Sequence, residues 1–190
     1  VEIAKKLGFE VRSFGEPGVL NDDHYLQVKN HCWKESKGIV DYVIVCDADE
    51  FIVPGNLTGP LPTVQGYNMI SEDMPKENIF EADHGVHSTS YSKQAIFDPT
   101  AIKEINFFHG CHTNQVEGEE GVVLDRSGSA SMYHFRMIGG VQRIIERHAT
   151  YRERMCEFNK KYGLGIHYLY EDEMRVKEWE EIKSRAVKIL

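Results

Sequence analysis

Three acidic residues lie together in the segment Asp41–Gly55, which reads DYVIVCDADEFIVPG. Asp47, Asp49 and Glu50 directly follow the apolar run YVIVC. Carboxylates this close repel one another and raise one another's pKa unless a cation lies among them. In an extended chain Asp47 and Asp49 point to the same side, so both can reach one ion. Carboxylate oxygens suit Mg²⁺ or Mn²⁺, which complete their shells with water and substrate phosphates. The segment therefore predicts a divalent cation that holds a diphosphate.

The alternative for these acids is a solvated loop, because short acidic triplets are common on protein surfaces. Their position favours metal binding. In open α/β sheets, ligands collect beyond the carboxyl ends of the strands, and Asp47 directly follows a predicted strand over Tyr42–Cys46.

Composition limits the classes of protein to which the chain can belong. Its 190 residues suffice for one domain with a core, and no apolar run approaches the roughly 18 residues needed to cross a bilayer. The net charge of −8 argues against binding nucleic acid through its phosphates. Residues 1–135 carry 10 Lys/Arg against 21 Asp/Glu, a balance of −11, whereas residues 136–190 carry 12 against 9, a balance of +3. We expect the basic part to face the acidic cluster.

The first half of the chain has the order of elements that is typical of a parallel α/β sheet. The pattern predicts a helix that ends near Gly8, a strand over Phe9–Phe14, a helix over 21–38 and the strand over Tyr42–Cys46. Because YVIVC is continuously apolar, its strand is expected to be covered on both faces. Five short β-like runs then predict a mixed or antiparallel extension of the sheet between residues 54 and 135: GYNMI, ENIFEA, TSYSKQAIF, KEINFF and ASMYHF.

The last third of the chain is predicted to be helical. Apolar residues repeat at intervals of three and four from Val141 to Tyr162, which indicates one long amphipathic helix. Its arginines, Arg147, Arg152 and Arg154, are interpreted as a solvated face. A final helix is predicted from a second apolar stripe: Val176, Trp179, Ile182, Ala186 and Ile189.

The segment DYVIVCDADEFIV resembles the D-x-D signature of GT-A-fold glycosyltransferases of the family-2-like and family-92-like type. Further matches follow in the family's order: YSKQAIFDP, FFHGCHTN, YHFR and NKKYGLGIHY. Glycosyltransferase domains encoded by large algal viruses are similar in size and organisation. The resemblance implies a GT-A-like (Rossmann-like) α/β fold with a mixed central sheet flanked by helices. It implies a catalytic domain over residues 1–165 and a C-terminal amphipathic helix over 166–190 packed on it. The family's first two strands have no counterpart here, which predicts an incomplete sheet.

The resemblance also implies roles for individual residues. Asp49 would bind Mn²⁺ or Mg²⁺ directly, and Asp47 would bind it through water or hold the donor's ribose or sugar. His134 would be the third protein ligand of the metal, and Glu50 would orient neighbouring groups. Three further residues would bind the donor or substrate: Lys93, His112 and Arg136. The implied donor is a UDP-sugar, the implied acceptor is a hydroxyl of a glycan or glycoconjugate, and the implied location is the cytoplasm.

An inverting transferase, which the resemblance favours, also needs a carboxylate to deprotonate the acceptor hydroxyl. We nominate Asp83, with Glu72, Asp73 and Glu81 as alternatives. Two other functions stay open: a sugar-nucleotide or carbohydrate-binding module without catalysis, and a divalent-metal phosphohydrolase. A His/Cys zinc site is disfavoured, because glycines interrupt the H-x-x-H and H-x-C-H patterns and no C-x-x-C pair is present.

Overall fold

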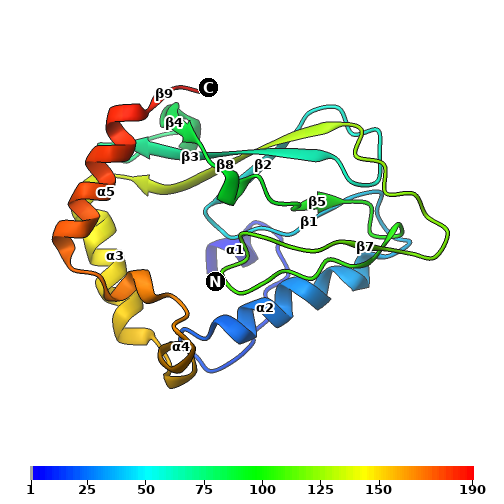
Figure 1. Ribbon diagram of the computed structural model, residues 1–190, viewed down its shortest axis with the longest axis horizontal. Coiled ribbons are helices and arrows are strands. Elements are labelled where there is room, and N and C mark those ends of the chain that lie inside the picture. Colours follow the sequence, from blue (N-terminus) through cyan, green and yellow to red (C-terminus); the bar gives the residue numbers. More distant parts are fainter. Residues whose placement is uncertain (1) are drawn as a thin grey trace.

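The computed structural model describes residues 2–190, in which a five-stranded sheet lies along one side of the molecule (Figure 1). The α-helices are α1 (Glu2–Lys6), α2 (Asp22–His31), α3 (Gly140–Arg154), α4 (Glu157–Tyr162) and α5 (Asp172–Arg185). The strands are β1 (Val43–Ile44), β2 (Glu50–Pro54), β3 (Thr63–Ser71), β4 (His84–His87), β5 (Ile96–Phe97), β6 (Ile102–Glu104), β7 (Glu117–Gly118), β8 (Ser129–Ile138) and β9 (Val187–Lys188). Short 3₁₀ helices are Cys32–Ser36, Ile79–Glu81, Thr89–Tyr91 and Ile166–Leu169.

The central sheet is mixed, as the sequence predicted. Its strand order is β2-β8-β3-β4-β9, and only β3 and β8 run parallel. The two long strands contain the predicted runs GYNMI and ASMYHF, whose β-branched and aromatic side chains favour strands. The register pairs His134 of β8 with Glu50 on one side and with Asn68 on the other. These three residues therefore form one row across the sheet.

The predicted parallel arrangement of the first half is wrong. Strand β1 has only two residues and pairs antiparallel with β5, outside the central sheet. The expectation that this strand is covered on both faces is also wrong, because Ile44 is 47% exposed. Residues 9–14 form no strand, and the side chains of Phe9 and Phe14 are exposed. An extended segment without a strand partner leaves its backbone groups to water, so its apolar residues alone do not make it a strand.

Three further elements differ from the sequence prediction. The run ENIFEA contains a 3₁₀ helix instead of a strand, because Asn78 and Glu81 form a capping box around it. The long helix is interrupted after Arg154, where Met155 forms a parallel bridge with Leu20. The last helix ends at Arg185, because the chain then pairs with β4 as β9, so Ile189 lies outside the helix.

The sheet is covered on one face by two separate assemblies. One assembly contains α2, β1, β5 and the β6–β7 pair, and its core packs around Trp33 and Phe97. The other contains α3 and α5, which stand at one end of the sheet (Figure 1) and bury Trp179 against Met137. The acidic triplet and His134 lie where β8 passes from the first assembly to the second.

Candidate functional site

The acidic triplet forms the turn that connects β1 to β2. The backbone N–H of Glu50 donates to the carbonyl of Asp47 (3.0 Å), and the backbone N–H of Asp47 donates to Glu50 Oε2 (2.9 Å). The turn is therefore closed by the side chain of one of its own acids. Because Glu50 begins β2 and pairs with His134, the turn lies directly beside the middle of β8.

Each acid of the triplet contacts a cationic side chain from a different part of the chain. Lys29 Nζ of α2 lies 2.8 Å from Asp47 Oδ1, and Arg147 Nη2 of α3 lies 3.0 Å from Asp49 Oδ2. Lys93 Nζ lies 2.6 Å from Glu50 Oε1 in a pair that is almost fully buried. Burial raises the pKa of Asp47, but Lys29, with a smaller contribution from Lys93, more than offsets this effect, so the pKa is lowered. The repulsion expected from the sequence is thus balanced by three cations of the protein itself.

The imidazole of His134 faces Asp49. Its Nε2 lies 3.8 Å from Asp49 Oδ2, and its Nδ1 lies 3.2 Å from Asn68 Oδ1. The ring of Tyr91 stacks on it with centroids 3.9 Å apart. Burial, although opposed by Asp49, lowers the pKa of His134 to about 3, so the ring is neutral near pH 7. With its Nδ1–H donated to Asn68, the lone pair of Nε2 points toward a carboxylate, and no proton lies between them.

Asp49 and His134 fit a divalent ion as a pair of ligands. Metal–ligand bonds to such groups are about 2.1 Å long, so donors 3.8 Å apart can reach one ion. A second group that fixes the other imidazole nitrogen, here Asn68, is typical of metal-binding histidines. Within residues 2–190, no cluster of three or more His, Cys, Asp and Glu side chains could hold a metal ion. Water and substrate oxygens would therefore have to complete the shell.

Arginines form the side of the site that faces the helices. The turn Gly139–Gly140, in which both residues have positive φ (85° and 79°), leads from β8 directly into α3. It brings Arg147 back over the strand, where Nη1 donates to the carbonyl of Arg136 (3.2 Å) and Nη2 to Tyr151 Oη (3.3 Å). Arg136 itself contacts His148 and lies 5.7 Å from the ring of Tyr168.

Two of the three cationic side chains that pair with the acids, Lys29 and Arg147, were not predicted from the sequence. Arg147 was assigned to a solvated face, yet its side chain is only 25% exposed. Lys29 was not considered, although it lies four residues after Tyr25 and three before Cys32, at helical spacing from both. A lysine on an apolar helical face was the available signal that a carboxylate partner lies opposite.

Lys93 and His112 line a small polar cavity beside the site. The cavity has a volume of about 280 Å³ and its lining contains no Asp or Glu. Gln94, which is buried, donates to the carbonyls of Pro62 and Ile96, and its Oε1 accepts from Arg126 Nη1 (3.4 Å). The ring of His112 packs edge-on against Tyr91, the residue that stacks on His134.

The structure does not bring Asp83 to the acidic triplet. Asp83 directly precedes β4, and its carboxylate contacts His84 Nδ1 (2.6 Å) and Lys188 Nζ (3.3 Å), which lower its pKa. Of the alternatives, Glu72 pairs with Lys183, and Glu81 accepts backbone N–H groups at its own 3₁₀ helix. The carboxylate of Asp73 has no contact that connects it with the triplet among the described residues.

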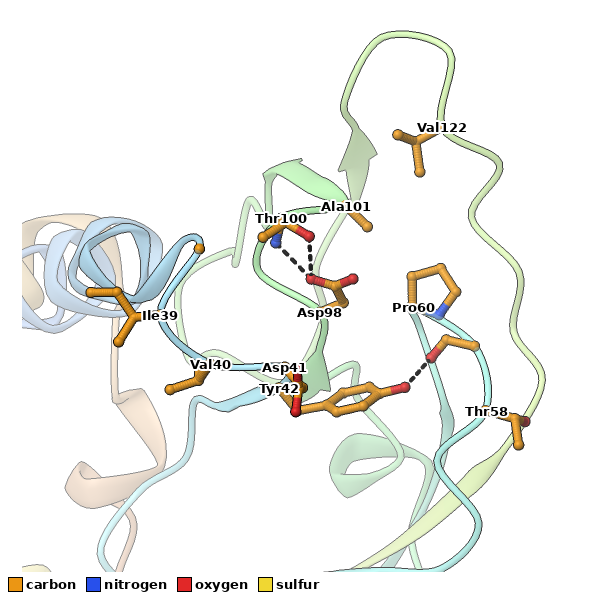
Figure 2. Close-up of a pocket in the computed structure, with 12 residues that line it drawn as sticks. Ile39, Val40, Asp41, Tyr42, Thr58, Pro60, Asp98, Thr100, Ala101 and Val122 are labelled. Carbon is orange, nitrogen blue, oxygen red and sulfur yellow. Dashed lines mark hydrogen bonds between the residues drawn. The ribbon is translucent and has the colours of Figure 1, made fainter.

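A larger cavity lies at the opposite end of β1. It has a volume of about 690 Å³ and includes Asp41, Tyr42 and Asp98 (Figure 2). Tyr42 donates to the carbonyl of Gly59 (2.9 Å), and Asp98 accepts from the backbone and side chain of Thr100 (2.7 Å each). Its lining contains no Lys, Arg, His or Cys. The carboxylates, imidazole and arginines that could perform chemistry are therefore gathered around Asp49 instead.

Comparison with known proteins adds no relative. No protein-family model, curated protein or solved structure matches the chain. Among residues 2–190, no helix has the length and apolar character that a membrane span requires.

Proposed function

We propose that the chain is a metal-dependent glycosyltransferase that moves a sugar from a nucleotide-diphosphate donor, a UDP-sugar, to a hydroxyl of a glycan or glycoconjugate. The observation that carries the proposal is the pair formed by Asp49 and neutral His134, with the arginines of β8 and α3 beside it. A diphosphate needs cations around it, and a hard divalent ion needs the oxygen and imidazole ligands that this pair offers.

The chemistry of sugar transfer suits this arrangement. Cleavage at the anomeric carbon builds positive charge on the sugar and negative charge on the departing diphosphate. Mn²⁺ or Mg²⁺, when bound by Asp49 and His134, would supply Lewis-acid stabilisation of that negative charge. Arg136 and Arg147 would contribute fixed positive charge from the side of the helices. Tyr91 and Asn68 would hold His134 in its orientation throughout.

The remaining predicted residues would support or extend this centre. Lys93 would fix Glu50 and hence the turn, and Asp47 would be kept ionised by Lys29. Asp83, the predicted general base, is ionised because His84 and Lys188 lower its pKa, but it lies beside the end of β3, away from Thr63 and Val64 at the start of that strand, and we do not assign it the base role for an acceptor bound there. Because β3 lies between β4 and β8, an acceptor that reaches Asp83 would have to cross the sheet.

We place the acceptor in the cavity beside Lys93. Its lining is rich in hydroxyl, amide and guanidinium groups and includes no carboxylate, so it suits a hydroxylated ligand such as a sugar residue. The contact of Tyr91 with both His112 and His134 links this cavity to the proposed metal site.

Thermal shift measurements test the function. UDP with Mn²⁺ should raise the melting temperature, whereas GDP, CMP, UDP alone and Mn²⁺ alone should raise it less. Asp49→Asn should abolish the shift caused by UDP and Mn²⁺ and leave the fold intact, and Asp41→Asn, at the other end of β1, should preserve it. Absence of any shift with every nucleotide would refute the proposal.

Turnover separates the proposed transferase from its two alternatives. A transferase releases UDP from a UDP-sugar faster when an acceptor glycan is present. A phosphohydrolase would use water to split the diphosphate of the UDP-sugar into UMP and a sugar phosphate without an acceptor, and a binding module would show the thermal shift without any turnover.

A further inference from the structure

Arg147 pairs with the carboxylate oxygen of Asp49 that would bind a metal ion. Its Nη2 lies 3.0 Å from Asp49 Oδ2, the same oxygen that lies 3.8 Å from His134 Nε2. The other two acids of the turn have their cations elsewhere, Lys29 on Asp47 and Lys93 on Glu50. Within the described chain, Arg147 is thus the cation that competes directly with a metal held by Asp49 and His134.

The surroundings of Arg147 allow it to leave Asp49 without leaving the site. Nη1 donates to the carbonyl of Arg136, and Nη2 is shared between Asp49 and Tyr151. Tyr151 lies one turn further along α3, so its hydroxyl and the carbonyl of Arg136 can keep the guanidinium near β8 when the carboxylate is lost. A guanidinium presents five N–H donors in a planar fork, which matches phosphate oxygens as well as it matches a carboxylate.

We propose that Arg147 is an exchangeable counter-ion: it neutralises Asp49 in the metal-free protein and transfers to the donor's diphosphate when a divalent ion takes Asp49. This inference rests on the proposed function. Its consequence is that metal and nucleotide bind with positive coupling, because the ion displaces the charge of Arg147 from Asp49 and a phosphate can then pair with it. In this scheme Arg147 contacts the diphosphate, but it takes part in no bond that forms or breaks.

The competing explanation is that Arg147 has only a structural role and holds α3 against the turn between β1 and β2. A structural role and a counter-ion role of Arg147 predict opposite effects of its removal on metal binding. If Arg147 only holds the turn in place, its removal weakens the metal site. If it competes for Asp49, its removal strengthens binding of the ion to the nucleotide-free protein.

The decisive experiment measures Mn²⁺ binding to the full chain by electron paramagnetic resonance of the free ion, with and without UDP. Arg147→Met keeps much of the side-chain volume and removes the charge. The matched control is Arg154→Met, because Arg154 lies on the same helix and its side chain donates to the carbonyl of Gly18, away from Asp49. Arg147→Lys retains a charge and serves as a second variant.

We expect Arg147→Met to bind Mn²⁺ about tenfold more tightly than the wild type without UDP, and to lose most of the increase in Mn²⁺ affinity that UDP causes in the wild type. Arg147→Lys should fall between the two, and Arg154→Met should match the wild type. If the wild type binds Mn²⁺ and UDP but Arg147→Met binds Mn²⁺ no more tightly than the wild type, the proposed exchange is wrong. The proposed function is not affected by that result. If the wild type binds no Mn²⁺ with or without UDP, the proposed function fails as well. If Arg147→Met does not fold, Mn²⁺ binding by Arg147→Lys that is no tighter than wild type overturns the exchange.

Discussion

At the scale of single residues, we expect disruption of the ion pair Lys93–Glu50 to lower the free energy of unfolding more than disruption of any exposed pair. Both side chains are almost fully buried, and Glu50 also accepts the backbone N–H of Asp47. Removing one member of a buried pair leaves an uncompensated charge, which typically costs about 3–5 kcal/mol. We therefore expect Lys93→Met to lower the free energy of unfolding by this amount in urea denaturation.

A solvent-exposed pair supplies the control for this prediction. Lys103 and Glu117 are 2.8 Å apart with more than half of each side chain exposed. Lys103→Met should change the free energy of unfolding by less than about 1 kcal/mol. The double variant Lys93→Met/Glu50→Gln should recover part of the loss, because it removes the unpaired charge. Similar effects of Lys93→Met and Lys103→Met would contradict the assignment.

Buried histidines should make the protein sensitive to mild acid. Burial and then Arg136 lower the pKa of His148 to about 3, compared with about 6.5 in an unfolded chain. Between these values the unfolded state binds a proton that the folded state does not. The stability contributed by neutral His148 is therefore fully present above about pH 6.5 and is lost as the pH falls toward 3, by about 1.4 kcal/mol per pH unit.

Denaturation curves at pH 7, 6 and 5 measure this effect. The free energy of unfolding should fall as the pH falls. His148→Gln should reduce the slope of this free energy against pH by an amount that corresponds to about one proton taken up on unfolding. Replacement of His31, an exposed histidine at the end of α2, is the control and should leave the slope as it is in the wild type. An unchanged slope in His148→Gln would show that His148 does not titrate in this way.

At the scale of elements, the close approach of β3 to the segment Tyr91–Ser92 positions the aromatic side of the site. A Cβ on Gly66 would lie 2.0 Å from the carbonyl carbon of Tyr91 and 2.5 Å from the nitrogen of Ser92, both backbone atoms. The N–H of Gly66 also donates to Ser92 Oγ (3.0 Å). Only glycine permits this contact, and the contact sets where Tyr91 stacks on His134.

We expect Gly66→Ala to be strongly destabilising, by about 3 kcal/mol or more, because backbone cannot give way as a side chain can. The matched control is Gly118→Ala, in another strand, where the new Cβ would meet only the flexible side chain of Leu124 at 3.1 Å. Thermal unfolding followed by circular dichroism measures both. A loss of less than about 1 kcal/mol for Gly66→Ala would mean that the segment Tyr91–Ser92 can move off the sheet.

The sequence predicted the elements that local pattern determines and failed where distant partners decide. Strands β3 and β8 follow from their own aromatic and β-branched residues. Strand β1 depends on β5, about 50 residues later, and the break after Arg154 depends on Leu20. The acids were identified from their own segment and His134 from the resemblance, but the cationic partners of the acids lie between 18 residues before and 98 residues after them. Contacts at such separations leave no periodicity in either segment.

At the scale of the whole molecule, the two oppositely charged parts of the chain face each other. Ion pairs join the basic C-terminal part to the acidic remainder at Arg147–Asp49, Lys183–Glu72 and Lys188–Asp83. The latter two are largely exposed and contribute little to stability. Of the three pairs, Arg147–Asp49 is the one that joins α3 to the acidic turn, and under the proposed function its charges would face the bound donor. A diphosphate with its metal ion carries the complementary distribution.

Under the proposed function, the polar cavity beside Lys93 allows acceptor binding to be tested separately from donor binding. Arg126 is held by buried Gln94 and has no carboxylate within salt-bridge distance among the described residues, so its remaining donors are available to a ligand. A hydrogen bond from a charged group contributes about 1.5–3 kcal/mol, or roughly 10- to 100-fold in affinity. We therefore expect Arg126→Ala to raise the KM for the acceptor by at least tenfold.

The same variant should leave donor binding unchanged, because Arg126 contacts none of the residues around Asp49. The dissociation constant for UDP in the presence of Mn²⁺, measured by calorimetry, should therefore equal that of the wild type. Lys103→Ala removes a cation from the exposed pair with Glu117, outside the cavity lining, and should alter neither constant. An increase in the dissociation constant for UDP with an unaltered acceptor KM would place the nucleotide, rather than the acceptor, in this cavity. Because the cavity is linked to His134 through Tyr91 and to the acidic turn through the pair Lys93–Glu50, that result would also require the donor to approach the proposed metal site from the side of β5 instead of the side of α3.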